Sequence, residues 1–258
     1  MKLIDTHCHL DFDAFDKDRQ LVINRAMEAG VEQFIVPGVT ADKWTALMNY
    51  ADEYHNVEYA LGLHPYFVNQ HQHADLLVLR ELLTKAHAIA VGEIGLDFFD
   101  KTLDRLKQLY FFEAQIIIAQ EFSLPIIVHA RKSHDDVIRL LKSINFTHGG
   151  IMHAFNGSMQ QAEQFMKLGF KLGFGGMLTY EKSSKLRALA KELPVEAIVL
   201  ETDAPDMTGA SHQGERNSPA YLPEVLQVLA SLREQSAVSL AEKIYDNSVT
   251  VLGLRKTG

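Results

Sequence analysis

Eight short apolar segments recur along the chain, and a stretch with helical spacing of apolar residues follows each of them. The segments resemble buried strands, and the stretches between them place apolar residues three or four positions apart. The expected strands are residues 2–9, 31–36, 57–63, 88–92, 124–128, 149–152, 170–174 and 197–200. The expected helices are residues 18–29, 41–54, 74–85, 103–121, 134–143, 159–168, 183–192, 219–233 and 240–252.

This alternation restricts the fold. Strands that alternate with helices pair in parallel through crossover connections. Eight such units in 258 residues predict an α/β fold, a TIM-type (β/α)8 barrel, formed by residues 1–258 as a single domain. An open, doubly wound sheet is the alternative, but no glycine-rich phosphate turn follows the first strand.

Composition excludes several classes of protein. The content of 47% hydrophobic and 22% charged residues is that of a globular domain with a sizeable core. No run approaches the ~20 apolar residues of a membrane span, and no apolar segment typical of a signal peptide follows Met1. The net charge of −8 opposes broad attraction to nucleic acid or anionic lipid. Cys8 is the single cysteine, so no intrachain disulfide can form, which fits a reducing cytoplasm. We also expect a monomer.

Histidines and carboxylates stand where the expected strands end. His7 and His9 are two residues apart, so they point to one side of an extended strand while Cys8 points to the other. Further candidates follow strands three, four, five, six and eight: His64, Glu93, His129, His153 and Asp203. The carboxyl ends of barrel strands surround one mouth, so these side chains are expected to converge there.

Such a set can hold two divalent ions with a carboxylate between them. Several imidazoles with a carboxylate bridge suit Zn²⁺ or Mn²⁺, whereas a pure Mg²⁺ site normally has more oxygen ligands. Each histidine by itself could instead be a hydrogen-bonded core residue. Their recurrence at strand ends favours the metal site.

Six motifs in the same order make the chain resemble the TatD family of metal-dependent hydrolases, closest to its YjjV-like branch, among the amidohydrolase-like barrels. The motifs are Asp-Thr-His-Cys-His at 5–9, Gly-Leu-His-Pro at 62–65, Gly-Glu-Ile-Gly-Leu-Asp at 92–97, Pro-Ile-Ile-Val-His-Ala-Arg at 125–131, His-Ala-Phe-Asn-Gly at 153–157 and Glu-Thr-Asp-Ala-Pro at 201–205. In the family, serines usually occupy the positions of Ala130 and Asn156. This difference bears on substrate contacts and leaves the ligand positions intact.

The resemblance implies a ligand set and an activity. His7, His9 and Asp203 are expected to bind one ion, His129 and His153 the other, and Glu93 to bridge the two. The family is associated with removal of nucleotides from DNA ends, which predicts an exonuclease-like phosphodiesterase that uses a water activated by two metals. We expect Asp203 to accept the proton of that water and Glu93 to take part in catalysis. The residues expected to contact substrate are His64, Arg131 and Glu201, although His64 could instead support a ligand or the structure, and Glu201 could instead orient a metal ligand.

Two other functions remain open from the sequence. The same barrel supports hydrolysis of amides, lactones or other carboxylic esters, because fold does not determine chemistry. A barrel that only binds a partner is the second alternative, and the intact ligand set counts against it.

Charged and aromatic residues in the mouth loops bear on the substrate class. Five basic residues follow strand ends and predict local phosphate attraction, with ordinary solvated loop charges as the alternative: Arg131, Lys132, Lys182, Lys185 and Arg216. Five aromatic residues in the same loops are candidates for base stacking: Tyr66, Phe67, Phe98, Phe99 and Tyr180. The seven other histidines lie in expected helices or polar loops and are predicted to be solvated: His55, His71, His73, His87, His134, His148 and His212.

Overall fold

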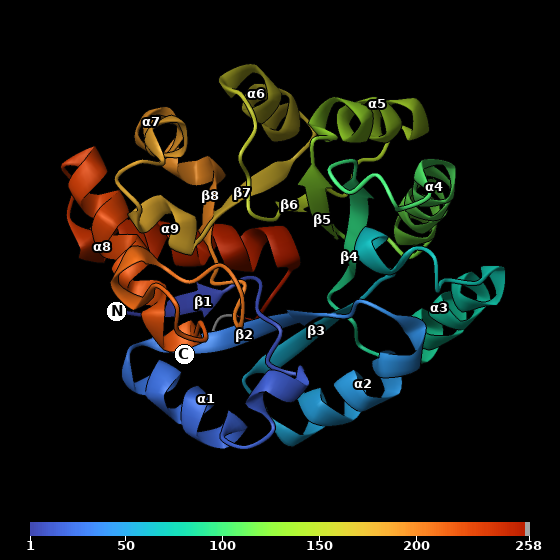
Figure 1. Ribbon diagram of the computed structural model, residues 1–258, viewed down its shortest axis with the longest axis horizontal. Helices are drawn as coiled ribbons and strands as arrows, with labels where there is room; N and C mark the ends of the chain where they lie inside the picture. The colour runs from blue at the N-terminus through green and yellow to red at the C-terminus, as the bar shows by residue number, and fades with distance from the viewer. Residues whose placement is uncertain (256–258) are drawn as a thin grey trace.

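Eight parallel strands form one sheet in the order β1 to β8, and helices surround it (Figure 1). This computed structural model describes residues 1–255. The strands are β1 (Leu3–Asp5), β2 (Val31–Pro37), β3 (Val57–Leu61), β4 (Ala90–Asp97), β5 (Ile126–Arg131), β6 (Gly150–Met152), β7 (Phe170–Phe174) and β8 (Ile198–Leu200). The helices are α1 (Arg19–Glu28), α2 (Trp44–Glu53), α3 (His73–Lys85), α4 (Arg105–Glu121), α5 (His134–Ile144), α6 (Met159–Lys167), α7 (Ser184–Glu192), α8 (Leu222–Arg233) and α9 (Ala237–Leu252). The predicted (β/α)8 barrel is confirmed.

The ring of strands is nearly closed between β8 and β1. There, the backbone N–H of Thr6 donates to the carbonyl of Leu200 at 3.1 Å. Just beyond the strands, the N–H of Asp203 donates to the carbonyl of His7 at 2.9 Å. The segments that carry the first and the last candidate ligands therefore run side by side at the mouth.

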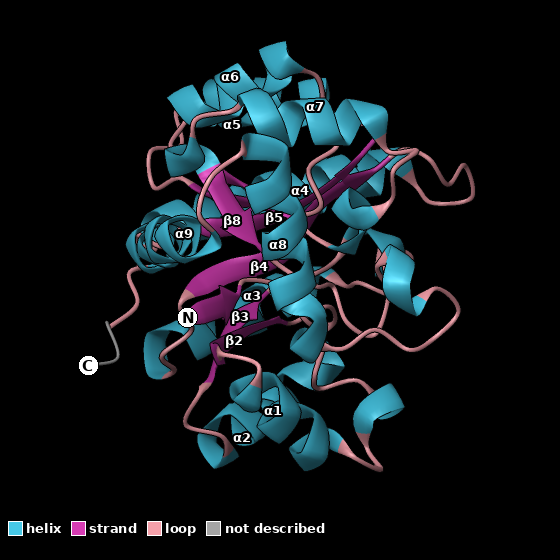
Figure 2. Ribbon diagram, turned by 90° about the vertical axis from the view of Figure 1, so that its left-hand side faces the viewer, coloured by secondary structure: helices cyan, strands magenta, loops and turns pink. Residues whose placement is uncertain are grey.

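The barrel interior is packed, and its lower end is covered by α9. An apolar layer takes one side chain from each of seven strands: Ile4, Ile35, Ala60, Ala90, Ile127, Ile151 and Val199. Tyr245, Val249 and Leu252 of α9 pack on this layer. Helix α9 lies on the side of the strands away from the mouth loops, where it contacts β1, β6, β7 and β8 (Figure 2). A ligand can therefore approach the barrel axis only from the carboxyl ends of the strands.

Strand β4 is longer than predicted, and Glu93 lies within it instead of following it. The sequence predicted a strand over 88–92, because Glu93 and Asp97 interrupt the apolar run. Strand β4 continues to Asp97 because Ile94, Gly95, Leu96 and Asp97 pair with β5. Gly95 has φ +146°, and a Cβ there would lie 2.0 Å from the carbonyl oxygen of His129, so only glycine allows this approach.

No helix within residues 1–255 is long and apolar enough to cross a membrane.

Candidate metal centre

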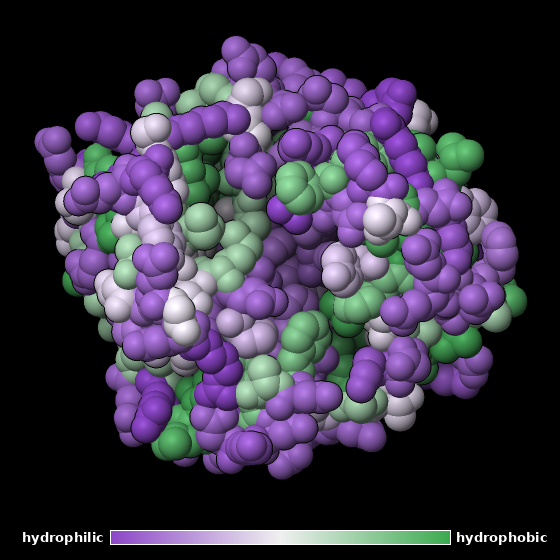
Figure 3. Space-filling view, viewed as in Figure 1, coloured by the Kyte–Doolittle hydropathy of each residue, from purple (hydrophilic) through white to green (hydrophobic). Residues whose placement is uncertain are grey.

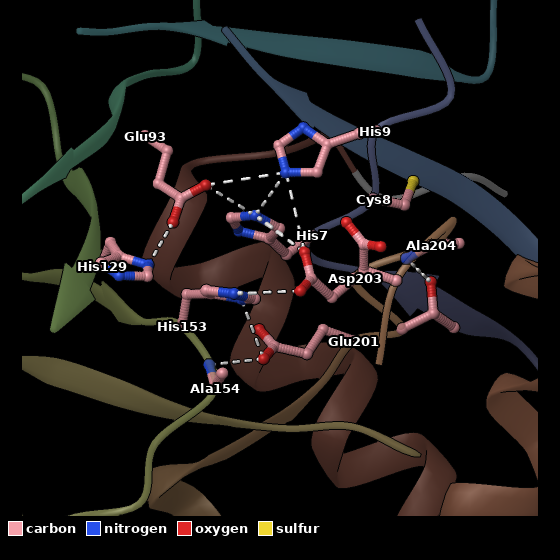
Figure 4. Close-up of polar contacts among 12 residues, drawn as sticks. His7, Cys8, His9, Glu93, His129, His153, Ala154, Glu201, Asp203 and Ala204 are labelled. Atoms are coloured by element: carbon pink, nitrogen blue, oxygen red, sulfur yellow. Dashed lines mark hydrogen bonds and ion pairs between the residues drawn. The ribbon is translucent and has the colours of Figure 1, made fainter. Parts of the chain in front are cut away.

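The mouth of the barrel brings the predicted ligands to one place (Figure 4). His7 and His9 follow β1, His153 follows β6, and Asp203 follows β8. Glu93 and His129 lie within β4 and β5. Cys8 points away from this cluster, and its thiol faces the carbonyl of Ile35 at 3.8 Å.

The carboxylate of Glu93 stands between two pairs of imidazoles. Its Oε2 lies 3.0 Å from Nε2 of His7 and 3.7 Å from Nε2 of His9. Its Oε1 lies 3.1 Å from Nε2 of His64 and 3.1 Å from Nδ1 of His129. Burial by itself would raise the pKa of Glu93, but the surrounding imidazoles hold that pKa well below its ordinary range. One carboxylate therefore faces both pairs of imidazoles.

Asp203 reaches the same cluster from the opposite side of the barrel. Its Oδ1 lies 3.7 Å from Nε2 of His7 and 3.6 Å from Nε2 of His9, and its Oδ2 lies 3.7 Å from Nε2 of His153. Burial raises the pKa of Asp203 to about 7, although His153 acts in the opposite direction. For His153, burial lowers the pKa, but the carboxylates of Glu201 and Asp203 outweigh it and raise the pKa to about 10.

Three overlapping groups have ligand atoms close enough for one ion. Within residues 1–255 they are His7 with His9 and Glu93, His7 with His153 and Asp203, and His64 with Glu93 and His129, and the ligand atoms of each group lie within 4.8 Å of one another. His129 and His153, which we predicted to share an ion, thus fall into different groups. Their pairing stays a prediction.

The chemistry of this cluster fits divalent cations. The cluster offers imidazole nitrogens and carboxylate oxygens, and within residues 1–255 no lysine or arginine pairs with Glu93 or Asp203. Nε2 of His7 lies 3.3 Å from Nε2 of His9, and Nδ1 of His7 is buried without a partner. Burial and the nearby His153 lower the pKa of His7 well below its usual range, so its neutral form is favoured. A neutral imidazole beside a carboxylate, as at His7 and Glu93, is a donor that Zn²⁺ and Mn²⁺ bind.

Two carboxylates orient the imidazoles from outside. Oδ2 of Asp97 lies 3.4 Å from Nε2 of His129, the nitrogen that faces away from Glu93. Oε1 of Glu201 lies 3.0 Å from Nδ1 of His153. A carboxylate on the outer nitrogen fixes the tautomer and the direction of a metal-binding histidine. Asp97 lies in the Gly-Glu-Ile-Gly-Leu-Asp motif, and a role for it was not predicted from the sequence.

Glu201 is buried, and Gly173 leaves the space that its carboxylate occupies. Its Oε1 also accepts the backbone N–H of Ala154 at 2.6 Å. A Cβ at Gly173 would lie 2.3 Å from Oε2 of Glu201. These contacts place Glu201 against His153 and favour the orienting role that we left open.

His64 faces Glu93 as a hydrogen-bond donor. Nδ1 of His64 accepts the backbone N–H of Tyr66 at 3.1 Å, so in the neutral ring the proton is on Nε2, which faces Glu93.

Nε2 of His71 donates to the carbonyl of His64 at 2.9 Å. His71 is 2% exposed and His134 is 8% exposed, so the prediction that both are solvated is wrong. His71 holds the His64 segment, and His134 packs edge-on against Phe155.

Two buried glutamines of α4 hold the segments that carry His64 and Asp97. Gln108 accepts the backbone N–H of Asp97 at 2.7 Å and donates to its carbonyl at 2.9 Å. Gln115 accepts the N–H of Leu63 at 2.7 Å and donates to its carbonyl at 3.3 Å. The sequence analysis missed both residues. Their spacing of seven, which places two amides on one face of a helix, was the available signal.

The cluster lies at the floor of a cavity of about 960 Å³ that opens at the mouth (Figure 3). Of the predicted rim residues, Arg131, Lys182, Lys185, Tyr66 and Phe67 line it. The other predicted rim residues contact protein groups outside the cavity or are buried. Phe98 is buried, Lys132 and Arg131 lie over Phe99, Tyr180 donates to the carbonyl of Thr208, and Arg216 pairs with Asp18.

Comparison with known proteins agrees with the fold and the cluster. Residues 4–253 match the family described as TatD related DNase. YjjV of Escherichia coli, named an uncharacterized metal-dependent hydrolase, is 38% identical over 98% of both chains, and its crystal structure superposes with a TM-score of 0.95. TatD of Yersinia pseudotuberculosis, named a 3'-5' ssDNA/RNA exonuclease, is 32% identical over 98% of this chain and 100% of its own. The phosphotriesterase homology protein of E. coli shares the fold at 16% identity, with a TM-score of 0.65 over 95% of this chain and 97% of its own.

The barrel, the cluster of imidazoles and carboxylates and these relatives define a metal-dependent hydrolase. The chain belongs to the TatD-related DNase family.

Proposed function

We propose that this protein hydrolyses phosphodiester bonds at the ends of nucleic acid chains. The observation that carries the proposal is the buried carboxylate of Glu93, which faces His7 and His9 with one oxygen and His64 and His129 with the other. A shared carboxylate suits two ions that hold a phosphate between them. The exonuclease name of the Yersinia relative supports the substrate class.

We propose two divalent cations per chain, Zn²⁺, Mn²⁺ or Mg²⁺, held by six residues. These are His7, His9, Glu93, His129, His153 and Asp203. When bound, the cations would polarise the phosphate and make water acidic enough to ionise near neutral pH. The surrounding imidazoles favour the ionised form of Glu93, which suits it to balance the positive charge.

The remaining chemistry is assigned to side chains around the cluster. Asp203 is 16% exposed to the cavity and is placed to accept the proton of the attacking water. His64 and Arg131 line the cavity, and the guanidinium of Arg131 can donate to phosphate oxygens. The Nε2–H of His64 faces Glu93 and would donate to phosphate only if Glu93 turned to the cations. Glu201 lies 3.0 Å from Nδ1 of His153 and would hold the ring proton there when Nε2 binds a cation.

An assay of the metal-loaded protein against three substrate classes tests this function. End-labelled single-stranded DNA and a simple phosphodiester should be cleaved, circular single-stranded DNA should resist, and a panel of lactones and cyclic amides should remain intact. Turnover of the lactones or amides alone would establish the carboxylic ester and amide alternative instead. No turnover of any class, with Glu93→Ala binding the same partners as the parent chain, would favour a binding barrel.

Substitution of Asp203 tests its role as proton acceptor. Because asparagine keeps an oxygen ligand but cannot take a proton, Asp203→Asn should lower kcat about 100-fold or more and change KM little. Steady-state kinetics at fixed metal concentration measure both parameters. An effect confined to KM would contradict the assignment.

We also propose that residues 1–258 form one domain that acts as a monomer in the cytoplasm. The shared apolar layer of the strands and α9 supports a single domain, and the free, buried Cys8 suits a reducing compartment. A molar mass of 29.0 kDa by light scattering would agree with the monomer, and twice that mass would refute it.

A further inference from the structure

The cavity has two chemically different sides, and we propose that they fix the direction in which a single-stranded chain end enters. The nucleoside to be released would lie against the aromatic side at β3, and the phosphates of the retained strand would lie against the cationic side at β7. This inference rests on the proposed phosphodiesterase function. It adds the polarity of the bound strand and the residues that determine it.

The two sides face each other across the metal cluster. In a ring of eight strands in sequence order, β3 and β7 are four places apart and therefore opposite. The loop after β3 carries Tyr66 and Phe67, and the segment after β7 carries Lys182 and Lys185. Figure 1 shows β3 and α7 on opposite sides of the barrel. A strand that spans both sides must cross the cluster on the way.

The β7 side offers two lysines that form no ion pair within residues 1–255. Lys182 and Lys185 are exposed and line the cavity. The ammonium group of Lys185 donates to the carbonyl of Asn156 at 3.3 Å, and that of Lys182 lies over the ring of Tyr180 at 5.6 Å. Within residues 1–255, neither lysine forms an ion pair with a carboxylate. Their charge is therefore available to phosphate oxygens, whose attraction does not depend on base sequence.

The β3 side offers aromatic surface without cations. Tyr66 is 57% exposed, and its ring meets that of Phe67 edge-on with centroids 5.3 Å apart. Phe12, which follows β1, also lines the cavity and stacks on the ring of His9 at 4.5 Å. No lysine or arginine from β1, β2, β3 or the segments that follow them lines the cavity. This side suits a base, because any nucleobase can stack on an exposed aromatic face.

The shape of the cavity favours a single-stranded end. The floor is closed by the apolar interior layer and α9, so a strand cannot pass through the barrel. A volume of about 960 Å³ is at the upper limit of ligand sites and holds a few nucleotides. A base can stack on Tyr66 only when its face is free, as it is in an unpaired chain end.

Chain-length dependence tests the polarity. The substrates are a nitrophenyl ester of thymidine monophosphate, which lacks further phosphates, and single-stranded oligothymidylates of two, four and eight nucleotides. The double variant Lys182→Gln/Lys185→Gln should raise KM for the octamer about tenfold, and more than it raises KM for the ester. The slope of log affinity for the octamer against log salt concentration should become shallower by about one, because two phosphate contacts are lost. The charge-matched control Lys191→Gln/Lys243→Gln lies outside the cavity and should show no length dependence.

Substitution on the aromatic side should affect short and long substrates equally. Tyr66→Ala should raise KM for the ester and for the octamer by a similar factor of about five to ten, and Tyr66→Phe should restore both values, because the stacking face returns. Fluorescence anisotropy of labelled oligothymidylates gives the same comparison without turnover, and circular dichroism verifies that each variant is folded.

Two results would overturn the polarity. One is a lysine double variant that behaves like its control at every length, and the other is a Tyr66→Ala effect confined to long substrates. Both differ from failure of the proposed function, in which the parent protein cleaves none of these phosphodiesters. In that case anisotropy still compares the variants, and equal affinities for the octamer would reject the inference separately.

Discussion

At the scale of single residues, a buried carboxylate has different consequences according to its neighbours. Glu93 faces four imidazoles and is placed to share charge between ions, whereas Glu201 faces one outer nitrogen of His153 and positions it. The two residues are not distinguishable by type. Their roles follow from which nitrogen of which ring each carboxylate meets.

Glu201→Gln should weaken metal binding while the fold persists. The amide keeps the size of the side chain but removes the negative charge beside His153, so the ring loses its fixed orientation. We expect metal affinity to fall about 10–100-fold. Calorimetric titration of the metal-free protein measures the affinity, and Glu192→Gln at the exposed end of α7 is the matched control. Equal affinities for the two variants would show that Glu201 does not support this ligand.

His134 should make stability depend on pH. Burial lowers the pKa of His134 to about 4 from the ordinary value of 6.5. Between these values the unfolded chain binds a proton that the folded chain excludes, so the free energy of unfolding falls as pH decreases from 6.5 to 4. The resulting loss in free energy of unfolding reaches about 3 kcal/mol at pH 4 and is absent above pH 7.

Urea unfolding at pH 7.5 and pH 5 measures this dependence. In His134→Gln the loss of stability between the two pH values should be smaller than in the parent protein. The exposed His87→Gln is the control and should retain the full pH dependence. A parent-like dependence in His134→Gln would contradict the assignment.

At the scale of elements, α4 links the barrel wall to the site. The predicted helix over 103–121 was confirmed as Arg105–Glu121, but its apolar pattern did not reveal why Gln108 and Gln115 are buried. An amide that satisfies both the N–H and the C=O of one residue requires a segment distant in sequence, and its position is set only when the barrel closes. Strand ends were predictable from apolar runs. The backbone partners of Gln108 and Gln115 were not predictable.

Gln108→Leu should destabilise the protein by about 2–4 kcal/mol. Leucine fills the space but leaves the buried N–H and C=O of Asp97 without partners, and each unsatisfied group costs ~1–3 kcal/mol. Asp97 also contacts His129, so kcat should fall as well. Urea denaturation measures stability, and the exposed Gln227→Leu in α8 is the control. A destabilisation no larger than that of the control would show that water or a backbone shift replaces the amide.

At the scale of the whole molecule, the barrel order was predictable because one strand–helix unit repeats eight times, and the carboxyl ends then meet at one mouth. The seven histidines and carboxylates of the site were predictable from their place after apolar runs, whereas the choice of six of them as ligands came from the family resemblance and stays a prediction. The closure of the lower end by α9 was not, since an amphipathic C-terminal helix has the same pattern whether it covers the wall or the bottom of a barrel. The grouping of His129 with His64 also depends on side-chain directions that only the closed ring defines.

Cations bound at the metal cluster should stabilise the folded barrel. The candidate ligands come from β1, β4, β5, β6 and β8 or from the residues that follow these strands, so cations bound there would tie together strands on all sides of the barrel. A ligand that binds only the folded state at 100 times its Kd adds about 2.7 kcal/mol to the free energy of unfolding. For a chain of this size that corresponds to roughly 5–10 °C in Tm.

Chelation should lower Tm by this amount, and Zn²⁺ or Mn²⁺ should restore it. The parent protein and Glu93→Gln are compared by calorimetry, and the metal-dependent part of Tm should largely disappear in the variant, because the bridging charge is lost. If Glu93→Gln gained as much stability from metal as the parent protein, the ions would bind elsewhere on the molecule, and the shared-carboxylate site would be wrong.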